Sequence, residues 1–258
     1  MNTSLQQLLA LPHLWQASQA RQINSVVATG YQNLDQELHD HGWPSDGTTE
    51  LFVPQPGIGE LRLLLPAMRR VQQQRPWLVF IAPPFLPYAS ALMRQNINPN
   101  AVLIVRPQSS RDLLWSAEQI LQSGCCAAVL TWAMDLNLGN QQLRRLQRAA
   151  HRGQCWHSLF RHPRFSRQAS PSVLRIQLSC SATGVLRLRI LKQRGGWGGQ
   201  QLNLTLPGDL TQLQRLSPEQ LPLPRQQFAR PYFPDSFPDN FPDNATVAKS
   251  HEVVANKP

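Results

Sequence analysis

The sequence has no long run of apolar residues, and its 258 residues include only 3 Lys against 22 Arg. A membrane-spanning helix needs roughly 18 or more consecutive apolar residues, so none is predicted. With 41% hydrophobic residues the chain can still build a core, which argues against wholesale disorder. The first 30 residues carry one basic residue, Arg21, and no apolar run behind a basic start, so we expect no secretory signal.

Cysteines are few and form no CxxC pair, which leaves neither a zinc pattern nor a redox motif. Two of the four are adjacent in the chain, and adjacent cysteines rarely bridge each other. We therefore expect reduced thiols in a cytoplasmic protein. The four are Cys125, Cys126, Cys155 and Cys180.

Acidic residues are missing from Leu136 to Pro207, where 12 of the 25 positive charges lie. Such a field attracts a polyanion or an acidic protein surface, and Arg favours bidentate and stacking contacts. The alternative is a set of solvated helix and strand faces. The 12 residues are Arg144, Arg145, Arg148, Arg152, Arg161, Arg164, Arg167, Arg175, Arg187, Arg189, Lys192 and Arg194.

Short apolar runs alternate with helical patterns along most of the chain. This order predicts an α/β fold, a three-layer α/β/α arrangement with a mostly parallel central sheet. The predicted strands are 49–53, 77–82, 101–105, 126–131 and 154–160. The predicted helices are 59–74, 110–122 and 140–151. Pro66 should kink the first helix, and Ser109 or Ser110 should cap the second. Asn140 should cap the third helix, which should end near Gly153.

Three later segments, 172–178, 185–191 and 201–206, alternate apolar with polar residues, as half-buried antiparallel strands at a sheet edge do. Arg187 and Arg189 should share an exposed face. The turn from Lys192 to Gly199 is basic and glycine-rich. Its Trp197 could stack on a base, fill a pocket in a partner or pack against the sheet edge.

The chain divides into three parts by composition. Residues 1–24 are predicted to form an amphipathic helical segment that docks on the body or on another protein. Residues 25–216 should form the core. Residues 217–258 are rich in Pro and carry three Phe-Pro-Asp repeats, so we predict a disordered tail, in which the Phe residues either anchor a partner or have no role.

The segment 50–63 has the order of strand, glycine-containing loop and helix that positions a phosphate loop in an NTPase. A working loop reads GxxxxGK[ST], in which Lys neutralises phosphate and the hydroxyl holds Mg²⁺. The degenerate loop consists of Pro54, Gly57, Gly59, Glu60 and Leu61. Pro54 replaces the first glycine, Glu60 the lysine and Leu61 the hydroxyl, so Glu60 should instead cap its helix or pair with an Arg.

The remaining parts of an ATPase site are also missing from the pattern. The strand that should end in Asp for Mg²⁺ ends in Thr131 and Trp132, and the segment after 77–82 offers Pro83 and Pro84 where a carboxylate should activate water. We therefore predict no ATP hydrolysis, no cofactor and no metal, with a residual ATPase as the alternative.

Histidines give no convincing site. His39 and His41 flank Asp40, but two such side chains do not complete a metal site, and we interpret them as part of a polar loop. His151, His157 and His162 lack the carboxylates that general-base catalysis requires.

Several spaced elements in one order resemble the RecA-type recombinases over about residues 25–207. They are Thr29-Gly30, Leu34-Asp35, Gly42-x-Pro44-x-x-Gly47, Glu50 and the late strand with its basic turn, Leu188–Trp197. The loop 56–61 followed by Leu63-Leu64-Leu65-Pro66 is similar to that of the ImuA/SulA-type relatives of RecA, in which the ATPase motifs have decayed.

This resemblance implies a role in the SOS response to DNA damage. ImuA-like proteins are accessory factors of error-prone translesion synthesis and work with a Y-family-like partner, ImuB, with RecA and with an error-prone polymerase. SulA-like proteins instead bind FtsZ and block septation. We favour the translesion role, with DNA as a further ligand and no membrane partner. The candidate DNA- or partner-binding residues are Arg161, Arg164, Arg167, Arg187, Arg189, Lys192, Arg194 and Trp197.

Overall fold

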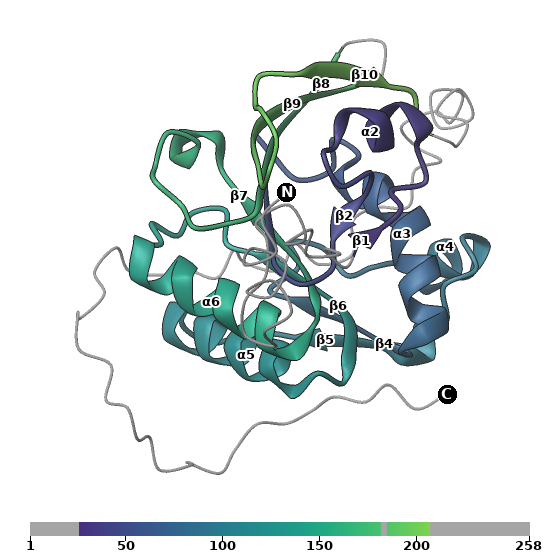
Figure 1. The fold of residues 1–258 in the computed structure, drawn as a ribbon. Helices are drawn as coiled ribbons and strands as arrows, with labels where there is room; N and C mark the ends of the chain where they lie inside the picture. The colour runs from purple at the N-terminus through teal and green to yellow at the C-terminus, as the bar shows by residue number, and fades with distance from the viewer. Residues whose placement is uncertain (1–25, 182–184, 207–258) are drawn as a thin grey trace, which may run out of the picture.

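Eight strands form the central sheet of the protein (Figure 1). The computed structural model describes residues 26–181 and 185–206. The order across the sheet is β10-β9-β8-β3-β7-β6-β4-β5. Each strand lies within a residue or two of a predicted one. The bounds are β3 (Thr48–Phe52), β4 (Trp77–Ile81), β5 (Val102–Val105), β6 (Cys126–Trp132), β7 (Trp156–Arg161), β8 (Leu174–Cys180), β9 (Leu186–Gln193) and β10 (Gln201–Leu204).

The strands from β5 across to β8 are parallel, and β9 and β10 continue the sheet as antiparallel strands. The predicted α/β class is thus confirmed. One detail differs, because β8 pairs in parallel with β3 and only its pairing with β9 is antiparallel. Its burial explains this: residues 174–176 are buried on both faces, as in a parallel strand, whereas Ser179 and Cys180 at its end are exposed.

Helices cover both faces of the parallel part of the sheet (Figure 1). On one face lie α2 (Gln32–Glu37), α3 (Glu60–Gln74) and α4 (Ala89–Arg94), and on the other lie α5 (Ser110–Ser123) and α6 (Asn140–Gly153). The sequence pattern predicts α3, α5 and α6. It misses α2 and α4, which at 6 residues each are too short to show helical periodicity.

Helix ends follow from identifiable side chains. The hydroxyl of Ser109 accepts the backbone N–H of Asp112 at 3.1 Å, which confirms one of the two expected caps of α5. The expectation for α6 was wrong by one residue: Gly139 is the N-cap, and its N–H donates to Gln142 Oε1 at 2.5 Å. At the other end of α6, a Cβ on Gly153 would lie 1.8 Å from a carbonyl oxygen of α5, so only glycine fits there.

Pro66 lies inside α3, which runs as one helix from Glu60 to Gln74. Proline has no N–H, so the carbonyl of Arg62 one turn earlier lacks its usual donor. The hydroxyl of Tyr31 donates to that carbonyl at 3.2 Å. Gly30 makes room, since a Cβ at this position (φ +90°) would lie 2.4 Å from the Pro66 ring.

A short antiparallel ribbon, β1 (Val26–Val27) with β2 (Trp43–Pro44), precedes the main sheet. Trp43 is fully buried and stacks on Trp156 of β7 at 6.2 Å between ring centroids. The ribbon thereby attaches the first described residues to the core.

No helix in residues 26–181 and 185–206 is long and apolar enough to cross a membrane. The predictions for 1–24, for the last stretch of the 25–216 core and for the 217–258 tail fall outside the described residues.

Candidate functional site

The loop that resembles a phosphate loop is closed by its own glutamate. Gly57 and Gly59 adopt positive φ angles of 92° and 107°, which favour glycine. The N–H of Gly57 donates to both carboxylate oxygens of Glu60, at 2.9 and 3.1 Å. Glu60 is 5% exposed. The expected helix cap is therefore wrong, because Gly59 is the N-cap of α3 and no side chain caps this helix. The Glu60 carboxylate instead takes a loop N–H that would otherwise be free to meet an anion.

The end of β10 covers the same loop. A Cβ atom on Gly59 would lie 2.8 Å from the Leu206 side chain, so Leu206 packs directly on the loop. The guanidinium of Arg62 donates to the Leu206 carbonyl at 3.2 Å. Leu61, at the position of the missing hydroxyl, packs against the apolar core. The loop thus joins the last described strand to α3.

Three adjacent strands, β3, β7 and β6, carry buried hydroxyls and a buried histidine. The ring of His157 lies between Thr48 Oγ1, 3.0 Å from Nδ1, and Thr131 Oγ1, 3.2 Å from Nε2. Burial lowers the pKa of His157 to about 3, so the ring is neutral. Its partners are two threonine hydroxyls and no carboxylate, which is an arrangement typical of a structural core residue.

Inside the protein, the fully buried Glu50 of β3 pairs with the fully buried Arg161 and with Arg175, whose side chain is 9% exposed. Its Oε2 accepts from Arg161 Nη1 at 2.7 Å, and its Oε1 accepts from Arg175 Nε at 3.1 Å. The hydroxyl of Ser170 also donates to Glu50. One carboxylate therefore balances two guanidinium groups, so the cluster as a whole keeps a positive charge inside the protein.

The structure corrects the prediction for Arg161, which is not on the surface. It was a candidate for contact with DNA or a partner, but its side chain is 0% exposed and committed to Glu50 and to Gln168 Oε1, at 2.7 Å. Burial lowers the pKa of Arg161, and the Glu50 carboxylate opposes that shift. The prediction fails because charge runs in the sequence do not show which arginine will meet a buried acid.

The segment 162–171 is held over this cluster by bonds from several strands. Gln168 donates to the Leu138 carbonyl at 2.8 Å, and Lys192 Nζ of β9 donates to the Ser170 carbonyl at 2.9 Å. Two candidate residues of this segment, Arg164 and Arg167, are exposed. Arg164 lies over the Phe165 ring at 4.8 Å. The cluster thus supports a basic surface loop from beneath.

Arg187 and Arg189 of β9 are exposed, whereas the residues that alternate with them, Leu186, Leu188 and Ile190, are buried. The predicted shared face is therefore present. Within residues 26–181 and 185–206, neither arginine forms a salt bridge.

Lys192 and Arg194 are half-buried and hold structure together. Burial and the nearby Arg175 lower the pKa of Lys192, and Glu50 opposes that shift. Arg194 Nη2 lies 3.1 Å from Asp46 Oδ1, and His151 contacts the other oxygen of Asp46 at 3.5 Å. Both basic residues therefore anchor the turn that follows β9.

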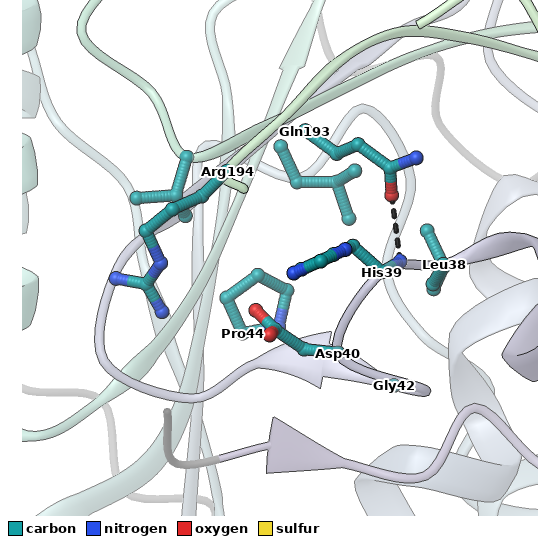
Figure 2. Close-up of a pocket in the computed structure, with 9 residues that line it drawn as sticks. Leu38, His39, Asp40, Gly42, Pro44, Gln193 and Arg194 are labelled. Carbon is teal, nitrogen blue, oxygen red and sulfur yellow. Dashed lines mark hydrogen bonds between the residues drawn. The ribbon is translucent and has the colours of Figure 1, made fainter. Parts of the chain in front are cut away.

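That turn presents Trp197, which is 88% exposed, so the packing alternative is wrong. Gln193 fixes the turn: its Nε2 donates to the Trp197 carbonyl at 2.7 Å and its Oε1 accepts from the His39 N–H at 2.8 Å (Figure 2). Gly195 and Gly196 are required because the His39 side chain lies within 2.9 Å of where their Cβ atoms would be.

A small cleft lies between the loop 38–44 and residues 193–194, and His39, Asp40 and Arg194 are among its lining residues (Figure 2). In the described part of the chain, no group of three or more His, Cys, Asp or Glu side chains could hold a metal ion. His39 and His41 instead belong to this loop, where His41 Nδ1 lies 3.0 Å from the Asp35 carbonyl oxygen.

No protein-family model matches the chain, and no curated protein matches its sequence. The resemblance to ImuA- and SulA-type proteins accordingly stays a prediction.

Proposed function

We propose that the protein is a non-catalytic adaptor of SOS-induced, error-prone translesion DNA synthesis. Its binding partners in this proposal are an ImuB-like Y-family homologue, RecA and an error-prone polymerase. It works in the cytoplasm and without a nucleotide cofactor. The observation that carries the proposal is the contrast between a phosphate loop closed by Glu60 and a basic, exposed edge of the same sheet.

The loop supports a binding role in place of hydrolysis. A nucleotide phosphate at Gly57 would meet the Glu60 carboxylate, and two like charges about 4 Å apart repel by about 4 kcal/mol at an effective dielectric of about 20. Leu61 offers no oxygen to Mg²⁺. The sheet keeps its α/β scaffold, so the surfaces of that scaffold are what remains for function.

The basic edge supports a partner or ligand of negative charge. Arg187, Arg189 and Trp197 are exposed on rigid strands and an anchored turn. Exposed arginines without acidic residues on the opposite strands attract a negatively charged ligand or surface.

The test is co-purification of the full chain with an ImuB-like partner at about 150 mM salt, where the Debye length is about 8 Å and weak surface attraction is screened. A stoichiometric complex supports the proposal, and its clean absence overturns it. Filamentation of cells on expression, with loss of FtsZ polymerisation in vitro, would instead favour a SulA-like septation inhibitor.

A further inference from the structure

One face of the three late strands is uniformly polar and carries no acid. In β8, β9 and β10 the residues that face each other form two rows, Gln177–Arg189–Gln201 and Ser179–Arg187–Asn203. Directly opposite residues on neighbouring strands share a face. We call these six residues the open face. Gln177 is half-buried and the other five are exposed.

The open face continues the side of the sheet on which α5 and α6 lie. Leu159, Glu50 and Arg175 form one row across β7, β3 and β8, and Leu159 belongs to the apolar cluster of α5 and α6. Gln177 and Ser179 follow Arg175 at two-residue steps, hence on the same side. Toward β8 the helices give way to the basic segment 162–171, and beyond it no helix within residues 26–181 and 185–206 covers this side of the strands (Figure 1).

We infer that the open face binds single-stranded nucleic acid, with Arg187 and Arg189 on the phosphates and Trp197 stacked on a base. The inference deepens the proposed function and rests on it, because a translesion complex works where single-stranded template is exposed. The two arginines lie about 6.8 Å apart along β9, since each residue of a strand rises about 3.4 Å, so they can contact different phosphates.

The chemistry of the open face favours a nucleic acid over a protein partner. The buried centre of a protein interface is apolar and depleted in charge, whereas the open face offers arginine, amide and hydroxyl groups with no aliphatic side chain. Covering these groups with protein would strip their water without apolar gain. A phosphodiester chain supplies charge to the arginines and leaves the interface wet.

Trp197 favours a single strand over a duplex. Stacking needs a base with a free face, which a single strand provides at every position and a duplex hides inside its stack. The Trp197 turn joins β9 to β10 and is already held by Gln193 and by the Arg194–Asp46 pair. The turn therefore loses little conformational freedom when a base stacks on Trp197.

The experiment uses the full chain and a fluorescein-labelled oligothymidylate of about 20 nucleotides, with anisotropy measured over a series of NaCl concentrations. Each phosphate contact to a single strand contributes about 0.7 to the slope of log K against log[salt]. The R187A/R189A variant should therefore lower the slope by about 1.4. The charge-matched control is R69A/R70A, which removes two exposed arginines from α3 on the opposite face and should keep the wild-type slope.

Trp197 is tested in the same assay. W197A should weaken binding roughly tenfold or more at constant slope, because stacking is apolar and carries no counterion release. W197F should keep most of the affinity, since it keeps an aromatic face. The affinity for a duplex of the same length should not depend on Trp197. Unchanged thermal unfolding of all variants shows that each is folded.

An unchanged slope in R187A/R189A, an equal loss in R69A/R70A, or no binding of wild type at about 50 mM salt would overturn the inference. If wild type ignores the oligonucleotide but R187A/R189A releases the ImuB-like partner, the open face is a protein interface and the adaptor proposal stands. If the oligonucleotide binds as expected but no partner co-purifies, the adaptor proposal fails and the open face remains a nucleic-acid site.

Discussion

The parallel and antiparallel parts of the sheet place arginine side chains in opposite environments. In the parallel part Arg161 is fully buried and bonded to Glu50. In the antiparallel part Arg187 and Arg189 are exposed and form no salt bridge within residues 26–181 and 185–206. All three come from the same acid-free stretch of sequence.

The difference shows that contacts in the fold decide which basic residues of one sequence stretch are buried and which stay exposed. Glu50 lies 111 residues before Arg161, yet it decides that this arginine supports the fold. No acid faces Arg187 or Arg189 across β8 or β10, where the opposite residues are Ser179, Asn203, Gln177 and Gln201. These arginines therefore stay available to a ligand.

The largest expected effect comes from removing the buried acid. Glu50→Ala leaves Arg161 and Arg175 buried without a counter-charge, which should cost about 3–5 kcal/mol of unfolding free energy in urea titrations. Asp135→Ala removes the exposed partner of Arg164 and should change stability by no more than about 0.5 kcal/mol. A loss below about 1 kcal/mol for Glu50→Ala would remove the contrast between the two parts.

The next effect is on pH dependence in the parallel part. The pKa of His157 is about 3 in the fold and 6.5 when unfolded, so the unfolded chain binds more protons between these values. The contribution of neutral His157 to the free energy of unfolding is fully present above pH 6.5. It falls as the pH drops toward 3, by about 2 kcal/mol between pH 7 and pH 5.

His157→Gln should flatten that part of the stability–pH curve, measured by urea unfolding at several pH values. His162→Gln, a change in the surface segment 162–171, should keep the wild-type slope. Equal slopes for His157→Gln and wild type would contradict the assignment of the acid-sensitive step to His157.

A smaller effect is expected at the junction between the two parts, where Glu60 closes the loop and Leu206 covers it. Glu60→Ala removes the acceptor for the Gly57 N–H and should cost about 1–2 kcal/mol, as the loss of a hydrogen bond to a charged group does. Gln55→Ala changes an exposed neighbour and is the control, which should leave the free energy of unfolding unchanged.

In a calorimetric titration wild type should show no affinity for ATP, and measurable binding would revive the ATPase alternative.

The smallest effect on stability belongs to the antiparallel part. Arg187→Ala with Arg189→Ala should shift the unfolding free energy by no more than about 0.5 kcal/mol, because both side chains are exposed and have no salt-bridge partner in the described part of the chain. Arg161→Ala is the matched comparison and should be severely destabilising. A loss above about 1 kcal/mol in the double variant would mean that the open face is structural.

Much of the fold could be predicted because strands and long helices leave periodic patterns. Short apolar runs predicted β3 to β7, and alternation of apolar with polar residues predicted β8 to β10 and the exposed face of Arg187 and Arg189. The pairing direction of β8 could not be derived from alternation alone, since that strand is parallel to one neighbour and antiparallel to the other.

The site was predictable in its loop and its turn but not in its buried charges. The degenerate loop and Trp197 stand out in the sequence through glycine spacing and residue type. The contacts of Ser170, Gln168 and Asp46 have no local signature, because each depends on a residue at least seven positions away or on another strand. The one available signal was an acid, Glu50, inside an apolar strand.

The position of β3 between β7 and β8 has a consequence for how the chain is made. Thr48 of β3 meets His157 of β7, which follows 109 residues later, and β8 comes later still. At about 5–20 residues per second on the ribosome, the backbone N–H and C=O groups of β3 wait roughly 5–20 s for the strands that pair with them. During that interval the nascent chain is most exposed to misfolding, so its yield should depend on chaperones that act before β7 emerges.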